Sequence, residues 1–230
     1  MSKNLFSLII SDLRAAKNRD PAARSYFEIF FAYSGFHATL IHRICHFLWG
    51  IKLKFLARFI SNLSRILTSI EIHPAAKIGY GFFIDHGAGL VIGETSKIGS
   101  NVTIYQQATL GGLTPSVDSE SQRNIKRHPT ICDNVIVGSG AQILGPVIIG
   151  KNSRIGANAV VLKDIPENIT YVGIPARKIE SKNLNEEFNA YGISKGKIDD
   201  PNKKSINALY KEIFTLNQKI KELKKQINQN

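Results

Sequence analysis

The chain has 230 residues, of which 43% are hydrophobic, and a formal net charge of +12 at pH 7. This length suits one sizeable domain or two small ones, and the hydrophobic fraction excludes a chain that is disordered throughout. The excess of Lys and Arg is compatible with a nucleic acid, an anionic membrane or a polyanionic small molecule as partner. The basic residues are spread along the chain without a compact stripe or a nucleic-acid motif, so we expect neither a nucleic-acid nor a membrane partner.

Residues 1–70 are predicted to form a helical domain that caps one end of the fold. The Asp20-Pro21 pair predicts a helix start, because proline is favoured at the first helical position, and Gly35 is expected to break the helix that follows. Helices are expected over residues 21–34, 36–49 and 53–70. His42 and His46 have the spacing of zinc ligands on a helix, but no third ligand accompanies them, so packing is favoured and no metal is expected.

The two cysteines indicate the compartment. Cys45 and Cys132 lie far apart in the sequence and form no metal or redox motif, which favours two free thiols in a reducing compartment. The first thirteen residues lack the small-residue cleavage site of a signal peptide. A cytoplasmic protein is therefore expected.

The stretch over residues 72–161 repeats with a period of six. Large aliphatic residues recur at this spacing, and a small or apolar residue follows most of them four places later. The aliphatic positions are Ile72, Ile78, Ile84, Ile92, Ile98, Ile104, Leu110, Ile131, Val137, Ile143, Ile149, Ile155 and Val161. This period fits neither a helix nor simple strand alternation and is typical of a parallel β-helix, in which three hexapeptides form one triangular coil. We predict an α+β fold with a left-handed parallel β-helix over residues 71–179.

Three further segments depart from the repeat. The period stops over residues 113–127, which are expected to form a loop at one corner of a coil, and residues 180–203 have the composition of a linker. Residues 204–230 are predicted to form a coiled-coil helix with the heptad positions Ile206, Leu209, Ile213, Leu216, Ile220, Leu223 and Ile227. Another copy of the helix is the expected partner, and docking onto its own domain is the alternative. The heptad residues favour two strands, whereas a three-fold β-helix would force three.

His86 is the histidine of the coils that is surrounded by small and flexible residues. A histidine makes a good general base at neutral pH, because its ordinary pKa lies near 6.5. Glu71, fifteen residues upstream on an adjacent coil, or Asp85 would hold its tautomer. Structural capping of a corner is the alternative role for His86. Arg127 and His128 together have the donors to bind a carboxylate.

Several motifs together resemble serine O-acetyltransferases of the hexapeptide-repeat acyltransferase superfamily. The resemblance covers roughly residues 13–179, and its more specific motifs are the Asp-His, Arg-His-Pro and Arg-Asp-Pro-Ala groups. The matching segments are Arg19-Asp-Pro-Ala, Ser34-Gly-Phe-His-Ala, Glu71-Ile-His-Pro-Ala-Ala-Lys-Ile-Gly, Phe83-Ile-Asp-His-Gly, Val91-Ile-Gly-Glu-Thr, Thr109-Leu-Gly-Gly, Arg127-His-Pro and Gly173-Ile-Pro-Ala-Arg.

The resemblance implies transfer of acetyl from acetyl-CoA to the hydroxyl of L-serine, giving O-acetyl-L-serine and CoA in cysteine biosynthesis. His86 would take the hydroxyl proton as the oxygen attacks the thioester directly, and Glu71, where the family often has aspartate, would orient that histidine. The ammonium of serine would be held by Asp20 and Asp85, and its carboxylate by Arg127 and His128. Acetyl-CoA, the co-substrate, would lie between neighbouring subunits and contact Ser139, Ala157, Lys163 and Arg177, with the oxyanion near the backbone of Gly112.

The resemblance also implies an assembly. Members of the family are trimers or dimers of trimers, and cysteine commonly inhibits them in the serine site. The helical region here is shorter than in the members that form hexamers, so a plain homotrimer is expected. Members that dock into cysteine synthase end in isoleucine, whereas this chain ends in Asn230, which speaks against that docking.

Three other functions are alternatives. An acetyltransferase for homoserine, a sugar or a xenobiotic would keep His86 and the Pro-Ala-Arg turn but would not need Asp20, Arg127 and His128 together. A hexapeptide carbonic anhydrase would need three histidine ligands, and the coils offer no paired histidines at suitable spacing. A non-catalytic trimeric assembly module would keep the fold and tolerate the loss of His86.

Overall fold

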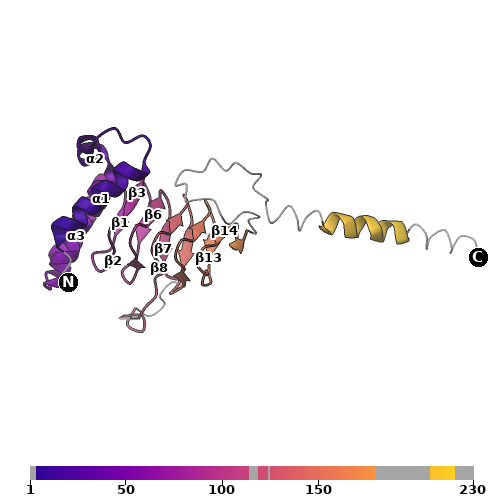
Figure 1. Cartoon of the computed structure of the whole chain (residues 1–230). Coiled ribbons are helices and arrows are strands. Elements are labelled where there is room, and N and C mark those ends of the chain that lie inside the picture. Colours follow the sequence, from indigo (N-terminus) through magenta and orange to yellow (C-terminus); the bar gives the residue numbers. More distant parts are fainter. Residues whose placement is uncertain (1–3, 114–118, 124, 180–207, 221–230) are drawn as a thin grey trace, which may run out of the picture. The chain divides into compact units, whose positions relative to one another are not determined.

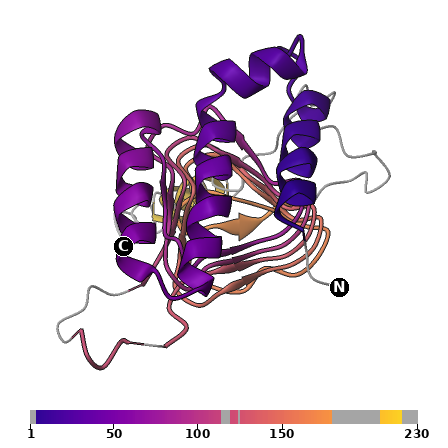
Figure 2. The same cartoon turned by 90° about the vertical axis from the view of Figure 1, so that its left-hand side faces the viewer.

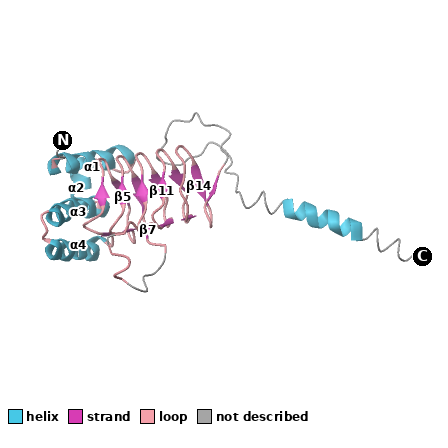
Figure 3. Ribbon diagram, turned by 90° about the horizontal axis from the view of Figure 1, so that it is seen from below, coloured by secondary structure: helices cyan, strands magenta, loops and turns pink. Residues whose placement is uncertain are grey.

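The computed structural model describes residues 4–113, 119–123, 125–179 and 208–220. The chain divides into two units, residues 1–178 and residues 179–230, and each is considered by itself. In the first unit, helices lie at one end of a solenoid of short strands (Figures 1 and 3). The α+β architecture expected from the repeat of six is confirmed.

Four helices cover the first coil of the solenoid, and Figure 2 shows them in front of its triangular outline. They are α1 (Leu5–Arg19), α2 (Tyr26–Ala32), α3 (Ser34–Gly50) and α4 (Lys54–Thr68). Two arginines tie this layer to the coil, and one of them, Arg19 of α1, donates to the carbonyl oxygen of Gly81. Arg43 of α3 pairs with the buried Asp12 of α1 and donates to the carbonyl oxygens of Ile78 and Gly79. The helices thereby satisfy backbone carbonyls that an open solenoid end would leave unpaired.

The predicted start of α2 was wrong. The helix begins at Tyr26, and Asp20 is the C-cap of α1. Ser25 accepts from the N–H of Glu28, and the Glu28 carboxylate accepts from the N–H of Arg24. This reciprocal capping satisfies two backbone donors at once and therefore fixes the helix start five residues after the proline.

Gly35 was also misread as a helix breaker. It lies inside α3, where a Cβ on this residue would be 2.2 Å from the carbonyl oxygen of Ile84. The glycine therefore serves the close approach of α3 to the first coil. The chain instead breaks at Tyr33, which is the C-cap of α2 and the N-cap of α3.

The solenoid consists of about five coils: each of the first four has one strand in each of three parallel sheets, and the fifth has a strand in two of them and an isolated bridge between Ile149 and Ile165 on the third side. The sheets have the orders β1-β4-β7-β10-β13, β11-β8-β5-β2 and β15-β14-β12-β9-β6-β3, with β15 antiparallel to β14. The strands are β1 (Glu71–Ile72), β2 (Lys77–Ile78), β3 (Phe83–Asp85), β4 (Val91–Ile92), β5 (Lys97–Ile98), β6 (Thr103–Tyr105), β7 (Thr109–Gly111), β8 (Thr130–Ile131), β9 (Ile136–Val137), β10 (Gln142–Leu144), β11 (Ile148–Ile149), β12 (Arg154–Ile155), β13 (Val160–Val161), β14 (Thr170–Val172) and β15 (Arg177–Lys178).

The repeated aliphatic residues form the core of the solenoid. They stack in register, as in the pairs of Ile92 with Leu110 and Ile143 with Val161, and all are buried. Full burial of one such side chain stabilises the fold by roughly 1.5–3 kcal/mol relative to exposure. The period of six thus reflects one inward position on each side of each coil.

The second unit is described at Ile179 and over residues 208–220, and the latter are helical. The apolar heptad positions of this helix, Leu209, Ile213, Leu216 and Ile220, are exposed in the single chain. The predicted linker and the remaining heptad positions, Ile206, Leu223 and Ile227, lie outside the described residues.

Candidate active site

The corner that carries His86 has more residues than the equivalent corner of the next coil. Five residues, 86–90, join β3 to β4, whereas three, 106–108, join β6 to β7 in the next coil. His86, Gly87 and Gly89 all have positive φ, of 59°, 90° and 76°. A Cβ on Gly87 would lie 2.5 Å from the side chain of Ile70, so the turn needs glycine for space as well as for conformation. The longer turn presents His86 at the surface.

The imidazole of His86 is accessible and faces a buried carboxylate. Its side chain is 71% exposed, and Nε2 lies 3.8 Å from Oδ1 of Asp85, which is 5% exposed. Glu71 lies near the same corner, since its N–H donates to the carbonyl of Leu90. Its carboxylate pairs with Arg65 at 3.5 Å. In this single chain Asp85 is thus the carboxylate paired with His86, and Glu71 is turned to Arg65.

Asp20 approaches this corner from the helical layer. Its Oδ1 accepts from the N–H of Ala22, and its Oδ2 accepts from the Tyr33 hydroxyl at 2.7 Å. Ser34 donates from Oγ to the carbonyl of His86 at 3.2 Å. The junction between α2 and α3 therefore contacts both the carboxylate of Asp20 and the turn of His86.

Arg127 and His128 lie elsewhere, at the corner that follows β4. The His128 ring occupies the space of a side chain on Gly93, where a Cβ would be 2.0 Å from Cδ2 and 2.2 Å from Nε2. The N–H of Thr95 donates to Nδ1 of His128, and Thr95 Oγ1 accepts from the N–H groups of Arg127 and His128. Thr95 Oγ1 also lies 2.9 Å from Nδ1 of His128, so four contacts to Thr95 fix Arg127 and His128 at the end of the loop of residues 113–127.

The guanidinium of Arg127 is held by two partners. It pairs with Glu94 at 2.5 Å and donates to the carbonyl of Gln122 at 3.0 Å. Lys126 donates to the carbonyls of Thr95 and Pro129, and burial lowers its pKa to about 8. Arg127 is therefore set in place before any ligand binds.

His128 is neutral at physiological pH. Burial first, and then the charge of Arg127, lower its pKa to about 4. Because Nδ1 accepts the N–H of Thr95, the proton of the neutral ring lies on Nε2. His128 can thus donate a hydrogen bond to an anion without carrying a charge.

Four of the five residues expected to bind CoA divide between these two corners. Ser139 and Ala157 stack on the corner of His86, where the N–H groups of Gln107, Gly140 and Asn158 join successive coils through the carbonyls of Ala88, Gln106 and Ser139. Gly112 follows β7 and Lys163 follows β13, so both lie on the corner of Arg127. Arg177 lies in the exposed final hairpin, where β15 pairs with β14.

We call the first corner the His86 edge (Asp20, Asp85, His86, Ser139, Ala157) and the second the Arg127 edge (Gly112, Arg127, His128, Lys163). The five-stranded sheet separates the two edges. One side of a coil has six residues, which span at most about 20 Å when extended, and this is the upper limit of the separation between the edges within one coil. Each edge has a pocket. One of about 430 Å³ is lined by Arg65, Ser69, Glu71 and Gly89, and one of about 240 Å³ by Gly112, Gln122, Lys126 and Arg127.

Two further findings concern binding partners. Among the described residues, no three His, Cys, Asp or Glu side chains gather as metal ligands would, and His46 contacts the carbonyl of Pro74. None of the described helices combines the length and apolar character needed to cross a membrane.

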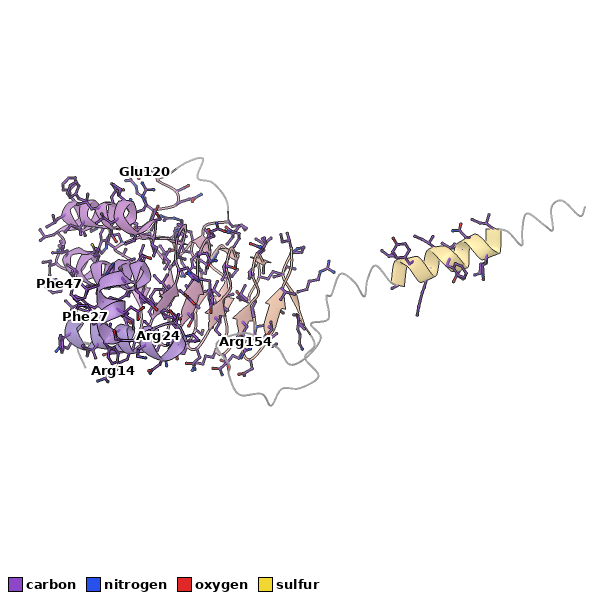
Figure 4. All side chains as sticks on the ribbon, turned by 90° about the horizontal axis from the view of Figure 1, so that it is seen from above. Arg14, Arg24, Phe27, Phe47, Glu120 and Arg154 are labelled. Carbon is purple, nitrogen blue, oxygen red and sulfur yellow. The ribbon has the colours of Figure 1, made fainter. Side chains whose placement is uncertain are left out.

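Figure 4 shows Phe27 and Phe47 at the helical end of the solenoid, where both are exposed.

Comparison with known proteins identifies the family. Residues 1–40 match the family model "Serine acetyltransferase, N-terminal", and residues 128–163 match "Bacterial transferase hexapeptide (six repeats)". The serine acetyltransferase of Bacillus subtilis is 44% identical over 97% of this chain and 99% of its own length.

Solved structures agree. The serine acetyltransferase of Neisseria gonorrhoeae in complex with serine is 40% identical, with a TM-score of 0.71 over 76% of this chain and 69% of its own. A serine acetyltransferase in complex with cysteine gives the same identity and TM-score over 76% of this chain and 70% of its own. With two site-bearing edges on a hexapeptide solenoid and a relative that matches nearly end to end, the chain belongs to the serine acetyltransferase family of acyltransferases.

Proposed function

We propose that this enzyme transfers acetyl from acetyl-CoA to the hydroxyl of L-serine, with His86 as the general base. The division of the site between two edges carries the proposal. The His86 edge offers a base and two carboxylates, whereas the Arg127 edge offers a guanidinium and a neutral imidazole donor. A zwitterionic hydroxy-amino acid needs both sets. An acceptor without an ammonium or a carboxylate would leave one set without a partner.

The two edges of one chain flank a whole sheet and do not meet. The simplest way to join them is a neighbouring copy whose Arg127 edge faces the His86 edge. Such a contact uses two different surfaces, so it is heterologous and closes into a ring when three copies meet. We therefore place the active site between subunits of a homotrimer. Exposed apolar residues of α4, among them Phe55 and Leu67, and the heptad face of residues 208–220 support self-association.

The reaction follows from this arrangement. The imidazole of His86 accepts the proton of the serine hydroxyl while that oxygen attacks the thioester carbonyl carbon. The tetrahedral intermediate collapses, the carbon–sulfur bond breaks, and the imidazolium returns the proton to the CoA thiolate. Asp85 stabilises the imidazolium by its charge. We assign Glu71 the role of orienting the His86 ring, after the Glu71 carboxylate leaves Arg65 and contacts His86.

Both edges would contribute to substrate binding. Asp20 and Asp85 hold the ammonium, and Arg127 and His128 of the neighbouring copy hold the carboxylate. Acetyl-CoA lies between the two neighbouring subunits and contacts Ser139 and Ala157, whose small side chains let the pantetheine arm approach the backbone. Lys163 and Arg177 face its phosphates, and the backbone at Gly112 stabilises the oxyanion.

Cysteine fits the same site. It differs from serine only in a sulfur for the oxygen, and a related enzyme has been solved with it. We propose that cysteine inhibits by occupying the serine position. The free thiols of Cys45 and Cys132 support a reducing compartment, which we take to be the cytoplasm.

The test is release of CoA thiol from acetyl-CoA with L-serine, homoserine or a galactoside as acceptor, for the wild type and His86→Ala. Serine-dependent release that falls by roughly a hundredfold or more in the variant is expected. Release with homoserine or the galactoside but not with L-serine would contradict the assignment of L-serine as the acceptor. A folded trimer that releases no thiol with any acceptor would instead favour an assembly module.

A further inference from the structure

Tyr33 lies where the helical layer meets the His86 edge. It occupies the single residue between α2 and α3, and its ring is half-buried. Its hydroxyl donates to Oδ2 of Asp20 at 2.7 Å. The next residue, Ser34, donates to the carbonyl of His86. Two adjacent residues thus connect an acidic side chain at the end of α1 with the turn that carries the base.

The carboxylate of Asp20 is held at both oxygens. Oδ1 accepts the N–H of Ala22 at 2.8 Å, a bond within the local turn. The hydroxyl of Tyr33 is the partner of Oδ2 and comes from thirteen residues away. An ionised carboxylate has about four acceptor positions, so two remain for a ligand. The turn bond alone would leave the carboxylate free to rotate about its axis, and the tyrosine bond fixes its plane.

The surroundings keep the tyrosine a donor. Burial, the bond to Asp20 and the negative charges of Asp20, Glu28 and Asp85 raise the pKa of Tyr33 above its ordinary value of 10. The hydroxyl therefore stays protonated throughout the physiological range. The strand end that carries Asp85 leads into the turn that meets this junction, because the neighbouring Ser34 donates to the carbonyl of His86.

We propose that Tyr33 is a positioning residue for the amino acid substrate: its hydroxyl orients Asp20 so that Asp20 and Asp85 receive the substrate ammonium together. The inference rests on the proposed function and adds a residue to which the sequence motifs assign no role. Tyr33 acts through Asp20, so its loss should weaken binding of the ammonium and leave the acetyl-CoA site and the base intact.

The experiment compares Tyr33→Phe with the wild type in steady-state kinetics of the full-length enzyme. The variant keeps the ring and removes one hydrogen bond to a charged group, so KM for L-serine should rise about 3- to 10-fold. The kcat should stay within about twofold and KM for acetyl-CoA should not change. Tyr26→Phe is the matched control, because Tyr26 is an exposed tyrosine at the start of α2, the helix that Tyr33 caps at its other end.

Two further arms separate positioning from a general structural effect. Ethanolamine keeps the ammonium and hydroxyl of serine and lacks the carboxylate, so its inhibition constant should rise by the same factor as KM for serine. In an Asp20→Asn background, Tyr33→Phe should not raise KM for serine further, because both changes act on the same interaction, that of the Asp20 carboxylate with the substrate ammonium.

Three results would overturn the inference. The first is a serine KM no higher than that of Tyr26→Phe in an enzyme that uses serine. The second is a joint change of kcat, both KM values and the unfolding temperature, which would show a general structural role. A wild type without serine-dependent activity would overturn the proposed function and this inference with it, and that failure is already visible without any variant.

Discussion

Replacing Gly93 by alanine should disable the Arg127 edge. The new Cβ would lie 2.0 Å from Cδ2 of His128, whereas an ordinary contact needs at least 3.4 Å, so the ring must move by about 1.4 Å. Thr95 holds this ring through a backbone N–H at 3.2 Å, and a shift of that size breaks the bond. Misplacement of a substrate-binding group by about 1 Å can cost on the order of a hundredfold in rate. We expect kcat/KM for serine to fall by about that factor.

The assay measures kcat/KM for serine and for acetyl-CoA, together with thermal unfolding. Overpacking of this kind costs about 1–3 kcal/mol of stability, so the variant should still fold. Gly50→Ala is the matched control, because a Cβ there meets nothing within 4 Å. In a His128→Ala background the clash is gone, and Gly93→Ala should add little. Wild-type serine kinetics in Gly93→Ala would refute the assigned role of His128.

Two other predictions concern the support and the protonation of His128, and a third concerns the packing of α3. Thr95→Val removes the oxygen that accepts two N–H groups, so KM for serine should rise about tenfold while KM for acetyl-CoA stays constant in steady-state assays. His128 has a pKa of about 4 when folded and about 6.5 when unfolded, so the unfolded chain takes up the proton first. Its contribution to stability is therefore complete above about pH 6.5 and is lost as the pH falls toward 4, by up to about 3 kcal/mol, and His128→Gln should flatten that slope in urea titrations. Gly35→Ala places a Cβ 2.2 Å from the carbonyl oxygen of Ile84 and should lower stability by about 1–3 kcal/mol, and an unchanged unfolding temperature would contradict the close packing of α3.

The solenoid could be predicted because its interactions are local in the repeat. Each aliphatic residue points inward once per six residues, so the sequence period and the coil side are the same length. His86 could be singled out for a similar reason, since the glycines beside it mark a turn that exposes a side chain. The start of α2 was mispredicted because the Ser25–Glu28 capping box outweighs the proline signal.

The partners of the site residues could not be predicted. Tyr33 reaches Asp20 across thirteen residues, and Thr95 reaches His128 across thirty-three, and neither spacing matches a repeat or a helix. The pairing of Thr95 with His128 depends on the register that the loop of residues 113–127 leaves between neighbouring coils. The Gly-Glu-Thr segment of residues 93–95 could be recognised as a motif in the sequence. That it supports Arg127 could be seen only once the structure had brought the two segments together.

In the proposed trimer, the active site forms between two copies, with His86 from one and Arg127 from the other. Mixing two inactive variants, His86→Ala and Arg127→Ala, by unfolding and refolding them together tests this arrangement. In random trimers, about one quarter of the interfaces join an intact His86 edge to an intact Arg127 edge. We predict that serine-dependent CoA release recovers to about a quarter of the wild-type rate. A mixture that stays as inactive as the separately refolded variants, although mixed trimers have formed, would contradict a site shared between subunits.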